Sequence, residues 1–170
     1  MSRLRYAISV VVLAVVGLIY ASFATGHVGN YEVISNSMAP TLLKGDRVLV
    51  DQRPHFTPAV DEVVVLDDPQ SADQPLTKRV AATAGQTVEI VDRYLTVEGK
   101  KWAPADMAPT LLSQDRHLPR TVIGGGEVFV VGDNIDNSED SVAFGPVPAA
   151  SVKGKLLFIY WPPSRMGKIR

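Results

Sequence analysis

The chain has 170 residues and a formal net charge of −1, from 18 acidic and 17 basic side chains. A length of this order predicts one folded domain rather than two. The nearly balanced charge excludes the basic field of a nucleic-acid-binding domain, so we expect no nucleic-acid partner. The chain has no cysteine, which excludes disulfides, thiolate metal sites and a cysteine nucleophile.

An uncharged apolar segment occupies residues 6–24. At 1.5 Å per residue, a helix of this length spans close to the ~30 Å hydrocarbon core of a bilayer. Arg3 and Arg5 precede the segment and no Lys or Arg follows until Lys44, so the positive-inside rule leaves the N-terminus in the cytoplasm. The sequence therefore predicts a cytoplasmic N-terminus (1–5), a transmembrane anchor (6–24) and an extracytoplasmic domain (25–170) in the cell membrane.

A cleaved signal peptide is the alternative for this segment, because Ser22, Phe23 and Ala24 fit a small-x-small cleavage pattern. The apolar run is longer than the roughly 7–15 residues that are usual in a signal peptide. Its length favours a retained anchor.

Short β-type runs separated by glycine, proline and aspartate follow the apolar segment. They lie at residues 47–51, 62–66, 86–91, 93–97, 127–131 and 155–161. Such a series predicts a mostly β domain, an antiparallel barrel or sandwich. Residues 103–126 show little periodicity and are expected to form an extended connection. The last run carries Phe158, Tyr160 and Trp161, which suit either the core or a membrane surface; we favour the core.

Three polar segments stand out between these runs. Residues 35–42 read Ser-Asn-Ser-Met-Ala-Pro-Thr-Leu, residues 77–80 read Thr-Lys-Arg-Val, and residues 132–141 read Gly-Asp-Asn-Ile-Asp-Asn-Ser-Glu-Asp-Ser before Phe144 and Gly145. Taken singly, they suit a polar turn, a solvated strand end and an Asp/Asn-rich turn. The third segment fails the EF-hand spacing, because no glycine stands at the sixth position. The histidines (His27, His55 and His117) are scattered, so we expect neither a metal nor a cofactor.

Together, in this order and behind an apolar anchor, the three segments resemble the signature motifs of type I signal peptidases. The resemblance runs from the anchor to about Val147. It implies a membrane-bound serine endopeptidase that cleaves signal peptides from exported preproteins after small-x-small sites, typically Ala-x-Ala. It also implies a catalytic β-domain of signal peptidase type, with preprotein signal peptides and the lipid bilayer as partners.

The resemblance assigns roles to individual residues. Ser37 corresponds to the nucleophile, Lys78 to its general base, and Ser35 to the residue that completes the oxyanion hole with the Ser37 N–H. Residues that orient or support the lysine are Ser138, Asp140, Gly132 and Asp133. Residues that line shallow apolar substrate pockets are Tyr31, Val33, Ile34, Met38, Leu42 and Val48.

A lysine activates a serine hydroxyl only when the amine is neutral. The ordinary lysine pKa is about 10.4, and burial among apolar groups lowers it by up to roughly 3–5 units. Val80, Ala81 and Ala82 next to Lys78 suit such a setting. If the lysine lies on a strand, Arg79 points to the opposite face.

The sequence departs from the family's pattern at several positions. Ile135 and Val142 stand where the family usually has arginine, and the second arginine would pair with the acid at Asp140. We therefore expect Asp140 to lack that salt bridge. The three remaining departures follow the Lys-Arg pair, at Ala82, Ala84 and Gln86. We expect these changes to affect loop rigidity and substrate range more than activity.

Several other functions fit parts of the pattern. A specialised relative such as a conjugative pilin-maturation peptidase uses the same residue pair, and a catalytically decayed, membrane-tethered binding domain would keep the fold. A self-cleaving repressor is disfavoured, because no helix-turn-helix segment precedes the serine. A Ser-His-Asp protease is excluded, because the serine lacks the Gly-x-Ser-x-Gly context and the histidines lie in no suitable one.

Overall fold

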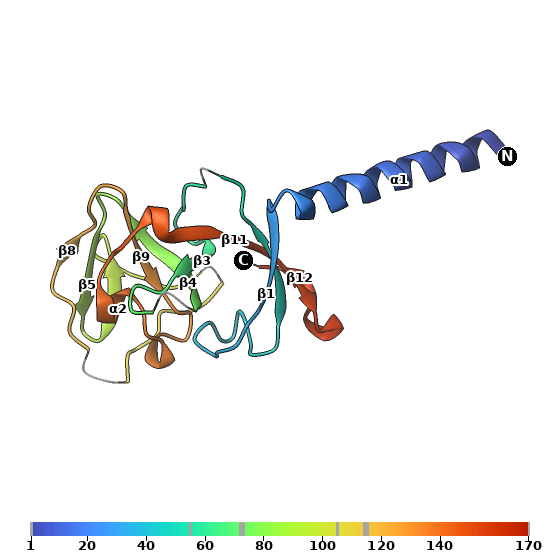
Figure 1. The fold of residues 1–170 in the computed structure, drawn as a ribbon. Coiled ribbons are helices and arrows are strands. Elements are labelled where there is room, and N and C mark those ends of the chain that lie inside the picture. The colour runs from blue at the N-terminus through green and yellow to red at the C-terminus, as the bar shows by residue number, and fades with distance from the viewer. Residues whose placement is uncertain (1, 55, 72–73, 105, 114–115, 170) are drawn as a thin grey trace.

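The computed structural model describes residues 2–54, 56–71, 74–104, 106–113 and 116–169, so His55 lies outside the described residues. Helix α1 (Ser2–Ala24) projects away from a β-domain that contains the rest of the chain (Figure 1). Residues 3–22 of α1 have a mean hydropathy of 2.1, and none of the side chains described in this stretch is buried against the protein. Among the described helices, α1 alone has the length and composition to cross a membrane.

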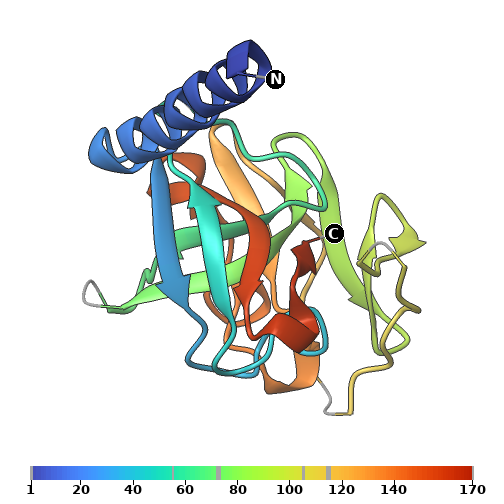
Figure 2. The same ribbon diagram turned by 90° about the vertical axis from the view of Figure 1, so that its right-hand side faces the viewer.

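The larger sheet has eight strands, and its neighbours pair antiparallel. The strand order is β1-β2-β11-β3-β4-β9-β10, with β12 paired to β11. In Figure 2, β1, β2 and β11 stand side by side next to the helix. The strands are β1 (Val28–Glu32), β2 (Arg47–Asp51), β3 (Val63–Asp67), β4 (Pro75–Thr83), β9 (Glu127–Val131), β10 (Val147–Pro148), β11 (Val152–Trp161) and β12 (Gly167–Lys168).

A second sheet of four strands, in the order β7-β6-β5-β8, lies at the end of the domain away from helix α1 (Figure 1). Its strands are β5 (Thr87–Val91), β6 (Tyr94–Val97), β7 (Lys100–Lys101) and β8 (Thr121–Val122). Four short helices complete the described elements: η1 (Ile135–Asn137), α2 (Ser141–Phe144), η2 (Ala149–Ser151) and η3 (Pro163–Arg165). The expected mostly β fold behind one apolar helix is confirmed.

The six predicted β-runs all contain strands. Two of them, 47–51 and 127–131, coincide with β2 and β9. The alternation in Arg47–Asp51 is explained by burial, because Val48 and Val50 are buried and Arg47 is exposed. Strand β1 was not predicted. Its sequence, Val-Gly-Asn-Tyr-Glu, has no buried residue and carries little β signal.

The core consists of three apolar clusters rather than one, because the large sheet is covered on both faces. The first cluster joins the small sheet to β9 through Phe129, Val88 and Leu95. From β11, Leu156 and Ile159 enter the second cluster, whereas Trp161 is 51% exposed. Phe158 and Tyr160 are half-buried, so the expectation that the aromatic residues of β11 lie in the core is wrong for Trp161.

Replacement of Phe129 by alanine is expected to lower the free energy of unfolding by about 3–5 kcal/mol, because the ring is fully buried where the two sheets meet. Val122→Ala, at a side chain 65% exposed, should cost about 0.5 kcal/mol or less. Urea unfolding of the full chain in detergent measures both values. Equal losses in the two variants would contradict this description of the core.

Candidate active site

Two consecutive basic residues of β4, Lys78 and Arg79, are buried; Lys78 is 3% exposed and Arg79 is 0% exposed. In the antiparallel register, Lys78 is opposite Val64 and Arg79 is opposite Val63. Residues opposite each other share a face of the sheet, and adjacent residues point to opposite faces. Lys78 and Arg79 therefore point to opposite faces, as expected, but neither is the solvated strand end that the segment alone suggested.

Arg79 is neutralised by Asp133 in a two-point ion pair. Arg79 Nε donates to Asp133 Oδ1 at 2.8 Å and Arg79 Nη2 donates to Asp133 Oδ2 at 2.7 Å, with both side chains fully buried. Thr41 Oγ1 also donates to this carboxylate. The pair thereby connects β4, the loop after β9 and the loop that follows Ser37.

Ser37 lies in the loop between β1 and β2, where the 132–134 segment holds its backbone. Asn134 N donates to Ser37 O at 3.0 Å, and Asn134 Nδ2 donates to Asn36 O at 3.2 Å. The hydroxyl of Ser35 lies within hydrogen-bond distance of the Ser37 hydroxyl, with 3.2 Å between the two Oγ atoms. Two hydroxyl groups are thus fixed at one place in an otherwise irregular loop.

Lys78 Nζ donates a hydrogen bond to Ser138 Oγ at 3.0 Å. Among the hydrogen bonds of the described residues, none joins Lys78 Nζ to Ser37 Oγ. Both residues nevertheless line one cleft. Catalytic hydrogen bonds are often long in a site without substrate and shorten when the substrate binds.

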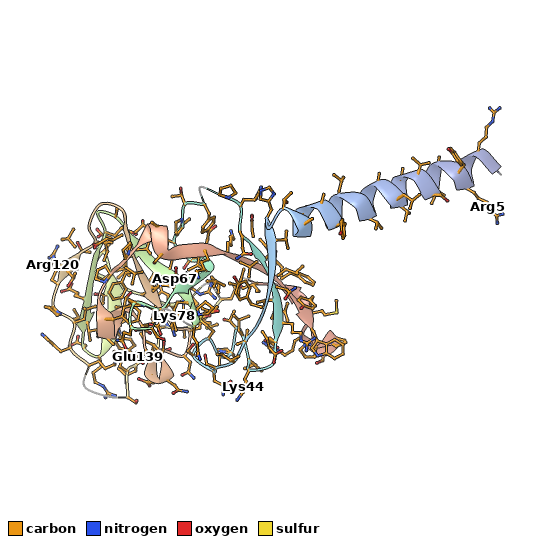
Figure 3. The ribbon with its side chains drawn as sticks, in the orientation of Figure 1. Arg5, Lys44, Asp67, Lys78, Arg120 and Glu139 are labelled. Atoms are coloured by element: carbon orange, nitrogen blue, oxygen red, sulfur yellow. The ribbon has the colours of Figure 1, made fainter. Side chains whose placement is uncertain are left out.

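The pKa of Lys78 is lowered from its ordinary value. Burial is the main cause, because it disfavours the ammonium form, and the negative charges of Asp140, Glu139 and Asp68 act in the opposite direction. Lys78 has no carboxylate at salt-bridge distance among the described residues. Figure 3 shows Lys78 inside the domain, with Glu139 on the loop beside it.

The cleft has a volume of about 490 Å³. Five of the six predicted substrate-pocket residues line it: Tyr31, Val33, Ile34, Met38 and Val48. The sixth, Leu42, is fully buried in the second apolar cluster, beneath the loop. Sequence reasoning missed the contribution of β3 and β4 to the lining. Leu76 could have been found, because it is two residues before Lys78 on the same strand.

Gly132 packs closely against the backbone of Ser37 and the side chain of Ser138. A Cβ atom at this position would come within 2.3 Å of Ser138 Oγ and 2.5 Å of Ser37 O. Gly132 N donates to Asp140 Oδ2 at 3.0 Å. Only a residue without a side chain fits at this distance from the Ser37 backbone.

Asp140 is fully buried and has three partners. Besides Gly132, it accepts a hydrogen bond from Val142 N at 3.1 Å, and Arg116 Nη2 lies 3.8 Å from its Oδ1 atom. The salt bridge from position 142 is absent, as expected, because that residue is valine, but Asp140 has an arginine from another segment, Arg116, as its ionic partner. The arginine comes from the long connection before β8 and not from the loop that contains Asp140. Burial explains the need for a partner, because an unpaired buried charge is strongly unfavourable.

This arrangement can support nucleophilic chemistry at a carbonyl group. It combines a serine hydroxyl, a second hydroxyl next to it, and a buried lysine with a lowered pKa in one largely apolar cleft. The described residues contain no group of three or more His, Cys, Asp or Glu side chains arranged to hold a metal ion.

Residues 3–161 match the signal peptidase family, peptidase S26. The chain belongs to this family. The resemblance noted from the three polar segments is thereby confirmed, and the chain is a peptidase-type hydrolase by family.

Two relatives and one solved structure illustrate the similarity. A probable signal peptidase I-1 from Synechocystis is 35% identical over 144 residues, covering 79% of this chain and 72% of that protein. A probable chloroplastic thylakoidal processing peptidase 2 from Arabidopsis thaliana is 33% identical over 144 residues. The match covers 79% of this chain and 38% of the Arabidopsis protein. A crystal structure of a signal peptidase I from Enterococcus faecalis is 26% identical, with a TM-score of 0.45, over 59% of this chain and 97% of that one.

A Gly132→Ala variant tests the close packing around Ser37. The added methyl group would collide with Ser37 O, which is backbone and cannot rotate away, so we expect the loop to shift and peptidase activity to fall roughly 100-fold. Gly125→Ala is the matched control, because a Cβ there meets nothing within 4 Å. Full activity in Gly132→Ala, measured on a preprotein substrate, would contradict the contact geometry.

Proposed function

We propose that this signal peptidase family member is a membrane-anchored serine endopeptidase that removes signal peptides from exported preproteins, with Ser37 as nucleophile and Lys78 as general base. The observation that carries the proposal is the burial of Lys78, which lowers its pKa, in the cleft that Ser37 also lines. A neutral amine is what a serine hydroxyl needs as its base. Family membership supports the cleavage of signal peptides as the overall reaction.

In this mechanism, Ser37 Oγ attacks the scissile carbonyl carbon while Lys78 Nζ takes the hydroxyl proton. The Ser37 N–H and the Ser35 hydroxyl stabilise the oxyanion; removing one such donor typically costs about 2.7–4 kcal/mol. Lys78 then gives its proton to the leaving amine, which departs with the mature protein. A water molecule, deprotonated by Lys78, hydrolyses the acyl-enzyme and restores the serine.

Ser138, Asp140, Gly132 and Asp133 are proposed to hold this pair in place. Ser138 binds the lysine amine directly, and this hydrogen bond fixes the orientation of the side chain. Asp140 accepts from the Gly132 N–H, and Asp133 neutralises the arginine next to the lysine. These residues act on Lys78 through the loop and have no proposed contact with the scissile bond.

The proposed substrates carry small-x-small sites, typically Ala-x-Ala, before the cut. The cleft is largely apolar, and Met38 and Val48 are each only 1% exposed within it, which supports shallow pockets. Segments 31–35 and 74–78 both contribute to the lining, so an extended peptide could lie along exposed backbone. The walls favour small apolar side chains over charged ones.

The anchor and its topology are part of the same proposal. Residues 6–24 of helix α1 are uncharged, and Arg3 and Arg5 lie in its first turn, which supports a membrane span at residues 6–24 with a cytoplasmic N-terminus. The catalytic domain at residues 25–170 would then lie outside the cytoplasm. Preprotein signal peptides and the lipid bilayer are its proposed partners, without a cofactor, metal or nucleic acid.

Cleavage of a preprotein with an Ala-x-Ala site tests the assignment of the two catalytic residues. Ser37→Ala and Lys78→Ala are each expected to lower kcat/KM by roughly 10⁴-fold or more, because each removes a reacting group. Ser164→Ala and Lys100→Ala change exposed residues of the same types and should retain activity. The assay uses the full chain in detergent.

Each result has a distinct meaning. Activity that persists in Lys78→Ala would identify another base. A wild-type protein that cuts none of several Ala-x-Ala preproteins would favour a specialised peptidase or a binding domain.

The pH dependence of kcat/KM should reflect the ionisation of Lys78. Activity is expected to rise with pH as the ammonium loses its proton, with a midpoint below the ordinary lysine pKa. In Glu139→Gln, one charge that favours the ammonium form is lost, so the midpoint should move to lower pH. Asp92→Asn, at an exposed turn, is the control. A shift to higher pH in Glu139→Gln would contradict this electrostatic account.

A further inference from the structure

The long connection between β7 and β8 contacts the loop that contains Ser138. Leu112 is fully buried in the first apolar cluster together with Ile135. Leu112 O accepts a hydrogen bond from Arg93 Nε at 2.7 Å, and Ser113 N donates to Asp136 Oδ1 at 3.0 Å. The described part of this connection is therefore attached both to the small sheet and to η1.

Arg116 makes two contacts with this loop. Its Nη1 atom donates to Ile135 O at 2.8 Å, and its Nη2 atom lies 3.8 Å from Asp140 Oδ1. Ile135 is three residues before Ser138 and Asp140 is two residues after it. A single guanidinium group thus holds both sides of the short segment that presents the Ser138 hydroxyl to Lys78.

The contacts of Asp140 extend this connection to Ser37. The Asp140 carboxylate accepts from Gly132 N, and Gly132 lies against both Ser138 Oγ and Ser37 O. The side chain of Arg116 is 19% exposed, whereas that of Asp140 is 0% exposed, so the arginine is the more accessible partner of this pair.

We propose that Arg116 is a positioning residue for the Ser37–Lys78 pair, acting through Asp140 and the Ser138 loop. This inference rests on the proposed function. Arg116 touches neither residue of the pair in the described contacts. Its role is to fix the loop that orients the lysine and to offset the charge of the Asp140 carboxylate.

The charge of Arg116 is expected to lower the pKa of Lys78. Asp140, Glu139 and Asp68 are the carboxylates that favour the ammonium form of Lys78, and Arg79 next to it is paired with Asp133. Without Arg116, Asp140 would keep its two backbone donors but lose the cation that offsets its charge. The ammonium would then be stabilised, and the pKa of Lys78 would rise.

Four forms of the full chain separate charge from geometry: wild type, Arg116→Gln, Arg116→Lys and Arg120→Gln. Glutamine removes the charge and retains a donor for Ile135 O, whereas lysine retains the charge and loses the planar two-point contact. Arg120 is exposed in the same connection, and Figure 3 shows it at the edge of the domain, away from Lys78, so it is the matched control. Far-UV circular dichroism checks that each variant is folded.

The first readout does not require activity. In protein labelled with ζ-¹⁵N lysine, the Lys78 resonance, assigned by its loss in Lys78→Arg, is titrated with pH. We expect the midpoint to rise by roughly half a unit or more in Arg116→Gln and to stay unchanged in Arg116→Lys and Arg120→Gln. An unchanged midpoint in a folded Arg116→Gln would overturn the electrostatic part of the proposal.

The second readout is the cleavage of an Ala-x-Ala preprotein. We expect kcat to fall about 10- to 100-fold in Arg116→Gln and severalfold in Arg116→Lys, with KM little changed and Arg120→Gln equal to wild type. Wild-type kcat in both Arg116 variants would overturn the positioning role. An inactive wild type would instead count against the proposed function, and the titration would still test the effect of Arg116 on Lys78.

Discussion

The buried ion pair between Arg79 and Asp133 is the interaction on which the rest of the site depends. Both side chains are fully buried, and two hydrogen bonds of 2.8 and 2.7 Å join them. Breaking such a pair leaves an unpaired charge in the interior, which typically costs about 3–5 kcal/mol. The pair therefore fixes the loop after β9 to strand β4. Through Thr41, it also fixes the loop that carries Ser37.

Strand β4 carries two buried basic residues, Arg79 and Lys78, whose surroundings differ. Arg79 has a carboxylate partner at hydrogen-bond distance, so its charge is compensated. Lys78 has a neutral hydroxyl as its hydrogen-bond partner, and burial lowers its pKa. Alternation along β4 separates the two side chains onto opposite faces. The fold thus supplies a buried cation that stabilises the loop and a buried amine suited to act as a base.

The irregular parts of the chain complete this arrangement. Loops 35–46 and 132–140 and the described parts of the β7–β8 connection, 106–113 and 116–120, contain few regular elements. The loop 132–140 nevertheless contacts each of the others through hydrogen bonds to side chains and backbone. Arg165, close to the C-terminal end, pairs with Asp46 at 3.0 Å and donates to Thr41 O at 3.0 Å. Loops are usually mobile unless their polar groups are paired, so these contacts give the cleft a defined shape.

The sequence by itself determined the apolar helix, the mostly β fold and the family. Those properties follow from local patterns: a long uncharged run, strand-period alternation such as that in Arg47–Asp51, and three motifs of fixed spacing. The tertiary structure alone decided that Leu42 lies in the core, that β3 and β4 help to line the cleft, and that Arg116 is the partner of Asp140. Arg116 lies 24 residues before Asp140, in a connection without periodicity. Burial of Asp140 requires a compensating charge but does not specify which segment supplies it, so only the packing of the loops could decide its source.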